Sequence, residues 1–178
     1  HLTKNIGADN PLPERRKIML KIDLIVVGKL KEDYLRAACE EYLKRLNSYA
    51  KVQVIELPEY KVPQNPSDSQ IETCLKQEGQ TILSKIPAQS FVAAMCIEGK
   101  LLSSEQLAQA VLDVQNQGNS RLVFVIGGSW GLDPAVKQRA DLRLSMSKMT
   151  FPHQLARVML LEQIYRACSI NHNSRYHK

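Results

Sequence analysis

Apolar positions along this chain follow two periods, and the change from one to the other predicts its elements. Short continuous apolar runs are typical of buried strands, whereas apolar residues spaced three and four apart indicate helices. Strands are expected at Lys21–Val27, Val52–Leu57, Phe91–Ile97, Leu122–Ile126 and Leu142–Met146. Helices are expected at Glu32–Leu46, from Ser69 to about Lys85, from Ser103 to about Gln117, from Asp133-Pro134 onward and at Pro152–Ile170. Strands separated by helix-length connections predict an α/β fold with a mostly parallel sheet flanked by helices.

Local signals add detail to this alternation. Ser69-x-x-Glu72 and Ser103-x-x-Gln106 fit capping boxes that open two of the helices. Glu98-Gly99-Lys100 is expected to form a turn after the third strand, and Pro58–Pro66 a loop. Leu122–Ile126 is apolar at every position, which predicts a central strand covered on both faces.

The length of 178 residues suits a single domain. We expect residues 1–18, which carry two prolines and no apolar period, to be a cloning leader or a disordered extension. The domain is then 19–178. No apolar run reaches the roughly 18 residues that a membrane span needs, so no membrane partner is expected.

The cysteines are scattered, at Cys39, Cys74, Cys96 and Cys168. None forms a Cys-x-x-Cys pair, so neither a zinc site nor a disulfide framework is predicted, and no metal is expected. We expect each to lie on or near an apolar face, which fits a reducing cytoplasm.

The net charge of +6 is unevenly placed. Beyond Ser147 the basic residues are Lys148, Arg157, Arg166, Arg175 and Lys178, and Glu162 is the acidic one. This composition favours a local patch for an anionic partner. Solvated charges on a helix and a frayed tail explain it equally well.

Two segments after predicted strands are candidates for ligand binding. Gly127–Gly131 follows a buried strand, and Met146–Phe151 supplies hydroxyls, amides and thioethers before a helix start. In open α/β folds, ligands bind at such strand ends. Alone, each segment is also explained by an ordinary tight turn or helix start. Neither matches a dinucleotide fingerprint or a phosphate-binding P-loop.

The last helix and the tail hold further candidates. His153 and Arg157 share one face, where a histidine more often caps or packs than catalyses. A guanidinium amid so much apolar sequence is expected to need an anionic partner. Residues Asn171–Lys178 combine a tyrosine, histidines and cations, which suits an unpaired nucleotide, although chain ends are often disordered.

Taken together, several motifs resemble one family. They are Gly-Lys-Leu at 28–30, Glu-Tyr-x-Lys-Arg at 41–45, Glu-Gly at 78–79, Gly-Lys-x-x-Ser-Ser at 99–104, Val-Ile-Gly-Gly-Ser-x-Gly-Leu at 125–132, Ser-Lys-Met-Thr-Phe-Pro-His-Gln at 147–154, Glu-Gln-x-Tyr-Arg-Ala at 162–167 and the terminal Tyr-His-Lys. Over Met19–Lys178 the chain resembles the RlmH-type (YbeA-like) ribosomal RNA methyltransferases of the SPOUT superfamily.

The resemblance implies a C-terminal trefoil knot, which sequence physics alone would not suggest because knots are nearly absent from proteins. It also implies a homodimer and an S-adenosylmethionine site built from the turns after three strands. Carried onto this chain, the cofactor residues are Met95, Gly127, Gly128, Met146, Ser147, Lys148, Met149, Thr150 and Phe151. Family members typically have Leu where Met95 stands and an acidic residue where Cys96 stands. Trp130 occupies a variable position and is given no role.

The reaction implied by the resemblance is methylation of N3 of a pseudouridine in large-subunit ribosomal RNA on the assembled ribosome, in the cytoplasm. The N3 proton must leave, so His153 and His177 are candidate bases. Arg157 and Arg175 are candidate stabilisers of the ring anion. Tyr176 is a candidate for stacking on a flipped base.

Three alternatives remain open. A SPOUT methyltransferase could act on another rRNA base or on tRNA. A basic C-terminal face would also serve a non-enzymatic ribosome-docking protein. A different nucleotide-binding α/β module is disfavoured by the missing fingerprints.

Overall fold

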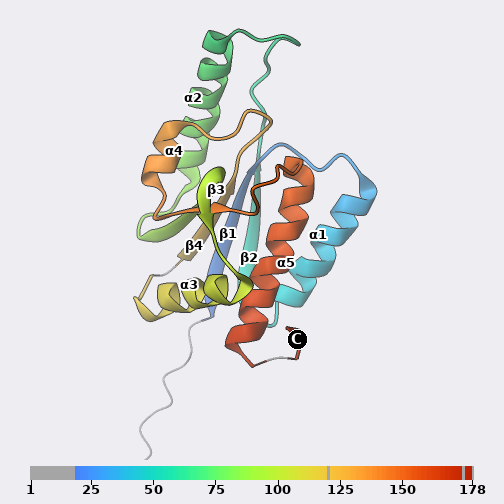
Figure 1. The fold of residues 1–178 in the computed structure, drawn as a ribbon, viewed down its shortest axis with the longest axis vertical. Helices are drawn as coiled ribbons and strands as arrows, with labels where there is room; N and C mark the ends of the chain where they lie inside the picture. Colours follow the sequence, from blue (N-terminus) through green and yellow to red (C-terminus); the bar gives the residue numbers. More distant parts are fainter. Residues whose placement is uncertain (1–18, 120, 174, 178) are drawn as a thin grey trace, which may run out of the picture.

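The computed structural model describes residues 19–119, 121–173 and 175–177, so the predicted leader lies outside the described residues. Strands and helices alternate along the chain (Figure 1). The strands are β1 Leu20–Val27, β2 Ala50–Leu57, β3 Ser90–Leu101, β4 Arg121–Ile126 and β5 Leu142–Ser145. The helices are α1 Asp33–Leu46, α2 Asp68–Lys85, α3 Ser104–Asn116, α4 Pro134–Arg139 and α5 His153–Asn171. The predicted alternation is confirmed.

The strands form one five-stranded sheet in the order β2-β1-β4-β3-β5, and every pair is parallel. All carboxyl ends of the strands therefore meet at one edge. The central strand β4 lies between β1 and β3, and Leu122–Ile126 is buried throughout, as its continuous apolar sequence predicts. The knot that the resemblance implies stays a prediction.

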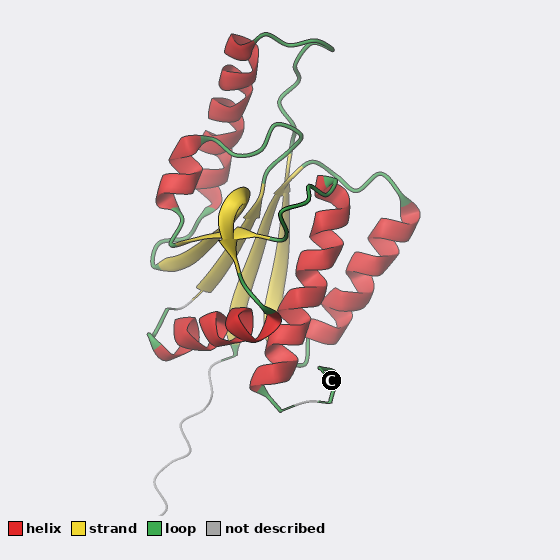
Figure 2. Cartoon of the chain, viewed as in Figure 1, coloured by secondary structure: helices red, strands yellow, loops and turns green. Residues whose placement is uncertain are grey.

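Helices cover both faces of the sheet (Figure 2). One core joins the sheet to α1, α3 and α5 and includes Phe124, Leu160 and Ile164. The other joins the opposite face to α2 and α4 through Ile82 and Val136. In the described part of the chain, no helix is both long and apolar enough to cross a bilayer.

The capping box of α2 lies two residues earlier than predicted. The Ser67 hydroxyl accepts the N–H of Gln70, whose side chain accepts the N–H of Ser67. Ser69-x-x-Glu72 matches the same pattern, but both residues already lie inside the first turns of the helix. The pattern alone could not choose between overlapping matches. The box at Ser103 and Gln106 is confirmed.

The predicted turn at Glu98–Lys100 is wrong in detail, because β3 continues through it to Leu101. Met95 and Lys100 both pair with Leu144 of β5, so the residues between them bulge out of the ladder. A Cβ at Gly99 would lie 2.7 Å from the backbone carbon of Leu144, so glycine permits this close approach. The bulge turns part of β3 into a wall of the cavity described next.

Candidate cofactor pocket and the C-terminal tail

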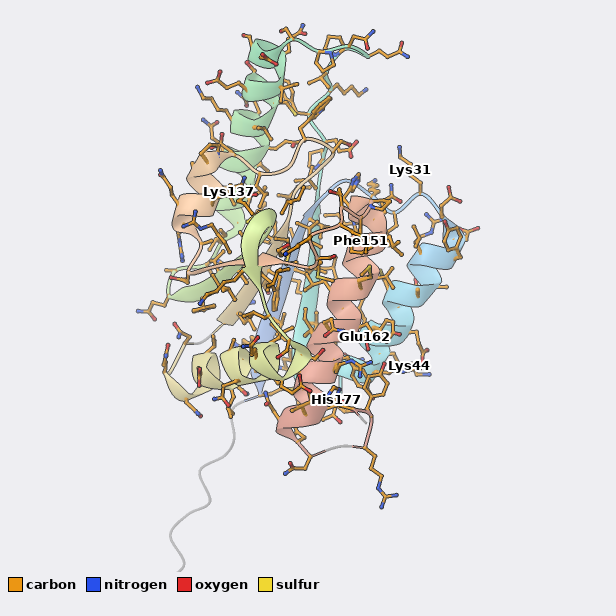
Figure 3. The ribbon with its side chains drawn as sticks, in the orientation of Figure 1. Lys31, Lys44, Lys137, Phe151, Glu162 and His177 are labelled. Atoms are coloured by element: carbon orange, nitrogen blue, oxygen red, sulfur yellow. The ribbon has the colours of Figure 1, made fainter. Side chains whose placement is uncertain are left out.

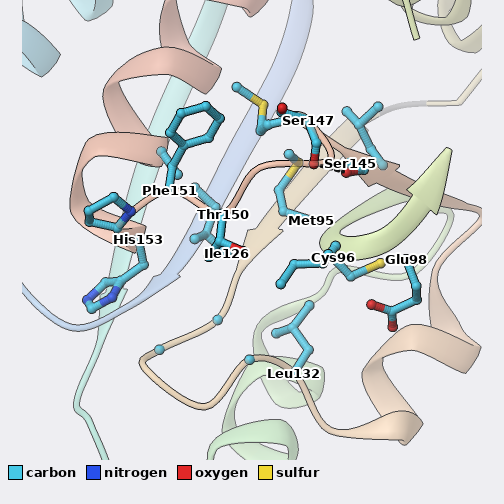
Figure 4. A pocket seen from close by; sticks show the side chains of 18 of the residues that line it. Met95, Cys96, Glu98, Ile126, Leu132, Ser145, Ser147, Thr150, Phe151 and His153 are labelled. Atoms are coloured by element: carbon cyan, nitrogen blue, oxygen red, sulfur yellow. Dashed lines mark hydrogen bonds between the residues drawn. The ribbon is translucent and has the colours of Figure 1, made fainter. Parts of the chain in front are cut away.

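A cavity of about 700 Å³ opens at the carboxyl edge of the sheet. Its walls come from the ends of β3, β4 and β5 and from the first turn of α5 (Figure 4). Of the predicted cofactor residues, those that line it are Met95, Gly127, Gly128, Met146, Ser147, Met149, Thr150 and Phe151. Lys148 does not line it and is exposed. The structure thus brings three predicted segments together around one space.

The turn after β4 forms a rigid wall of this cavity. Gly131 donates its N–H to the carbonyl of Gly128 at 3.1 Å, and the two residues form an isolated β-bridge. Gly131 has a φ of 88°, a left-handed conformation that favours glycine. A Cβ at Gly127 would lie only 2.3 Å from the Gly131 carbonyl oxygen. Glycine is therefore required here for the backbone to fold back on itself.

The segment after β5 forms the opposite wall and is held by its own hydroxyls. The Ser145 hydroxyl donates to the Ser147 carbonyl at 2.9 Å, and the Ser147 hydroxyl accepts the Met149 N–H at 3.0 Å. Helix α5 then starts at His153 after the N-cap residue Pro152, and no side chain caps its first turn. The free N–H groups of that turn favour a negatively charged ligand group.

The bulge of β3 supplies the third wall. Met95 and Cys96 line the cavity, as does an ion pair between Glu98 and Lys137 of α4. The hydrogen bond from Lys137 lowers the pKa of Glu98, so this carboxylate stays charged. Burial, assisted by Glu98, raises the pKa of the Cys96 thiol, which keeps it neutral. Cys96 is half-buried, unlike the three other cysteines, which are fully buried as expected.

His153 is the candidate base that lines the cavity. Its Nε2 lies 3.8 Å from Oε1 of Glu59, which belongs to the loop after β2. The imidazole side chain is 27% exposed, so it is reachable from the cavity and from solvent. Glu59 is distant from His153 in the chain, so nothing local in the sequence indicated this carboxylate partner.

Arg157 lies one turn further along α5 and is buried. It donates to Oε2 of Glu56 at 2.8 Å and to the Gly28 carbonyl at 3.0 Å. The anionic partner expected for this guanidinium is therefore Glu56 of β2. Arg157 is absent from the cavity lining, and its bonds tie α5 to the ends of β1 and β2. Its suggested role toward the ring anion stays a prediction.

The C-terminal tail folds back over the second half of α5 and reaches the middle of that helix (Figure 3). The Tyr176 hydroxyl donates to Glu162 at 3.0 Å, and the Arg166 guanidinium lies 4.8 Å from the centre of the Tyr176 ring. His177 bonds Glu105 at 2.8 Å through Nε2. At about 1.5 Å rise per residue, Glu162 is roughly 14 Å along the helix from His153. Within one chain, the residue of α5 that holds Tyr176 is therefore more than two helical turns from His153 at the cavity.

Two features of the tail bear on its predicted roles. Burial and the bond to Glu162 raise the pKa of Tyr176 to about 12, so the phenol is a neutral hydrogen-bond donor at ordinary pH. Arg175 is exposed and makes no ion pair with the described residues. The guanidinium of Arg175 is thus available to a partner, whereas Tyr176 and His177 are engaged.

Glu78 is a residue beside the pocket to which the sequence analysis gave no role. It is buried in α2, and its Oε2 accepts the N–H of Tyr60 at 3.0 Å. Its carboxyl oxygens lie within 3.7 Å of where a Cβ of Gly128 would be. Burial raises the pKa of Glu78, and the nearby Glu59 raises it further. The Glu-Gly pair at 78–79 was visible in the sequence, but nothing local indicated its closeness to the glycine turn.

Comparisons with known proteins agree on one relationship. The family model described as "Predicted SPOUT methyltransferase" matches residues 20–177. The chain is also 51% identical over 159 residues to "Ribosomal RNA large subunit methyltransferase H" of Clostridioides difficile (strain 630). That match covers 89% of this chain and 100% of the relative.

Proposed function

This chain belongs to the SPOUT methyltransferase family, and we propose that it methylates N3 of a pseudouridine in large-subunit ribosomal RNA on the assembled ribosome. It is an S-adenosylmethionine-dependent methyltransferase, as the resemblance implied. The relative's name supports an rRNA substrate. The observation that carries the proposal is the convergence of three strand ends on one cavity.

The chemistry of the cavity fits S-adenosylmethionine. Its thioether and aromatic groups, such as Met95 and Phe151, suit the flat adenine and the methylthio carbon chain. The Ser147 segment and the uncapped first turn of α5 offer hydroxyls and N–H groups to the ribose and the carboxylate. When bound, the cofactor supplies an electrophilic methyl group. The protein positions the two reactants and keeps water away.

The methyl acceptor must lose its N3 proton. His153 faces the cavity and is the candidate acceptor of that proton within one chain. Glu59, 3.8 Å from Nε2, would then stabilise the imidazolium that forms. This arrangement assigns proton transfer to the helix start and leaves recognition of the base to other groups.

In this proposal the enzyme is a homodimer that acts on the assembled ribosome in the cytoplasm. Large apolar side chains are exposed near the cavity and the start of α5, namely Ile97, Leu101, Met149 and Leu155. A second copy packed there would cover them. It would also explain how a tail that lies along α5 serves catalysis, because the tail of one copy could approach the cavity of the other.

Methyl transfer from labelled S-adenosylmethionine to separate RNA substrates tests the proposal. We expect incorporation into assembled ribosomes or large subunits lacking this modification, and none into free rRNA or tRNA. Mass spectrometry of the labelled RNA should place the methyl group on N3 of one pseudouridine.

Other results would point to the alternatives. Methylation of tRNA or of another base would overturn the substrate assignment while leaving the enzyme class intact. Calorimetry that shows no S-adenosylmethionine binding, together with tight ribosome binding, would indicate a docking protein. A monomer at working concentration would overturn the dimer.

A further inference from the structure

Trp130 is a large aromatic side chain left exposed at the cofactor cavity. It lines the cavity and is 44% exposed, and it belongs to neither hydrophobic core. The family resemblance gives this position no role. Exposing an indole to water is unfavourable, so a partner that covers it gains free energy.

The backbone holds this indole in a defined place. Ser129 and Trp130 are the central residues of the turn closed by the Gly131 N–H and the Gly128 carbonyl. The adjoining Gly127 packs against Gly131, which prevents the turn from shifting. A rigid aromatic ring loses little conformational entropy when it binds a ligand.

Both the ring and the polar atom of Trp130 are unused by the described residues. The aromatic pairs and cation–π contacts of the described chain involve Tyr42, Tyr49, Tyr165, Tyr176 and His172, together with Arg45 and Arg166. None includes Trp130, and the indole N–H has no hydrogen-bond partner among the residues described. The side chain therefore offers a π-face and a donor to a ligand.

A flat nitrogen heterocycle is the ligand that suits this combination. Stacking uses the π-face of any nucleobase, and the indole N–H can donate to a ring nitrogen or carbonyl. Two other apolar side chains that line the cavity, Ile97 and Met149, are also 64% and 71% exposed.

We propose that Trp130 is a stacking platform for a nucleobase at the cofactor cavity. The base comes from the adenine of the methyl donor or from the RNA strand that carries the acceptor. This inference rests on the proposed function for the RNA source only. A loss of about 10-fold in affinity is expected when the ring is removed.

Because Trp130 is the chain's single tryptophan, its emission reports this site directly. The first measurement is fluorescence of the full chain titrated with S-adenosylhomocysteine, with adenosine, and with methionine as the fragment lacking a base. The second compares Trp130→Leu with Trp130→Phe by calorimetry with S-adenosylhomocysteine and by the KM and kcat of methyl transfer to ribosomes. Position 130 has no left-handed φ, so both variants should fold.

The two sources give different results. Quenching by adenosine but not methionine, with about 10-fold weaker S-adenosylhomocysteine binding in Trp130→Leu and near-normal binding in Trp130→Phe, identifies the donor's adenine. Unchanged donor binding with a raised KM for ribosomes in Trp130→Leu, restored by Trp130→Phe, identifies an RNA base. Tyr34 is an aromatic residue on α1 that is 70% exposed, so Tyr34→Leu is the matched control. It should change neither the affinity for S-adenosylhomocysteine nor the KM for ribosomes.

The proposal is overturned if Trp130→Leu equals the original chain in both donor affinity and ribosome KM. It is also overturned if the Trp130 emission responds to dilution of the protein and to no nucleobase, since a second copy would then cover the ring. Failure of the proposed function looks different, because the unaltered chain itself would then fail to methylate ribosomes.

Discussion

The two ends of α5 contrast sharply. At its start, the helix joins a cavity whose walls have glycine turns, free N–H groups and exposed apolar side chains. Beyond its end, the chain folds back over the second half of the helix, where Tyr176 bonds Glu162 at the middle of α5 and His177 bonds Glu105 of α3. The start of the helix leaves polar groups open to a ligand, whereas Tyr176 and His177 of the tail form their hydrogen bonds within the chain.

We propose that this difference separates donor binding from acceptor recognition. The open end has the groups that a methyl donor needs, and they come from one chain. The closed end carries the residues predicted to handle the base, yet it lies roughly 14 Å along the helix. Changes in the tail should therefore leave the affinity for the methyl donor unchanged and should lower only the rate of methyl transfer.

Deleting residues 175–178 should have the largest effect and tests this separation directly. Methyl transfer to ribosomes is expected to fall by about 100-fold or more, because the groups proposed to position the base are removed. The affinity for S-adenosylhomocysteine, measured by calorimetry, should stay near normal. An unchanged rate of methylation after the deletion would contradict the role of the tail in methyl transfer. A loss of donor affinity would contradict the independence of the donor site from the tail.

Gly127→Ala should produce the converse result. The new Cβ would meet the Gly131 carbonyl oxygen at 2.3 Å, so the turn must move. We expect donor affinity to fall by about 100-fold, in line with overpacking costs of up to about 3 kcal/mol. Gly118→Ala is the control, since a Cβ there meets nothing within 4 Å, although its φ of 77° adds strain. Equal donor binding in both variants would contradict the role of the turn.

Arg157→Met should lower the stability of the fold, because Arg157 ties α5 to β1 and β2. Removing the guanidinium leaves Glu56 and the Gly28 carbonyl without their partner. A cost of about 2 kcal/mol in unfolding free energy is expected, less than for a fully buried pair because Glu56 is 38% exposed. Urea unfolding provides the measurement. Loss of activity with unchanged stability would instead favour the predicted role at the ring anion.

Glu78→Gln should have the smallest effect, and its sign depends on pH. Burial raises the pKa of Glu78 in the fold, so stability is highest when the group is protonated and falls as the pH rises through that pKa. The variant should therefore be more stable than the original chain at pH 7.5, on the order of 1 kcal/mol, and no more stable below about pH 4. Glu72→Gln, an exposed acid on the same helix, serves as control. A Glu78 variant that is less stable at pH 7.5 would show that the carboxylate is needed in its charged form.

The pattern of the sequence was enough to predict the elements and the strand-end segments that line one cavity. Each strand and helix is set by local periodicity and by turn residues such as Asp133-Pro134, which indeed caps α4. In a parallel sheet all strands end at one edge, so the glycine turn and the segment after β5 had to approach each other. Where overlapping local signals compete, as for the α2 cap, the pattern was two residues off.

Tertiary packing alone decided which distant side chains meet. Arg157 bonds Glu56, which is 101 residues away, and His153 lies beside Glu59 of another loop. The tail packs on Glu162 rather than against the cavity of its own chain. The periodicity of apolar residues indicates which face of a helix or strand is buried. Which side chains then bond each other depends on how the helices and strands pack in space. That information is spread over the whole core, so no short stretch of the sequence contains it.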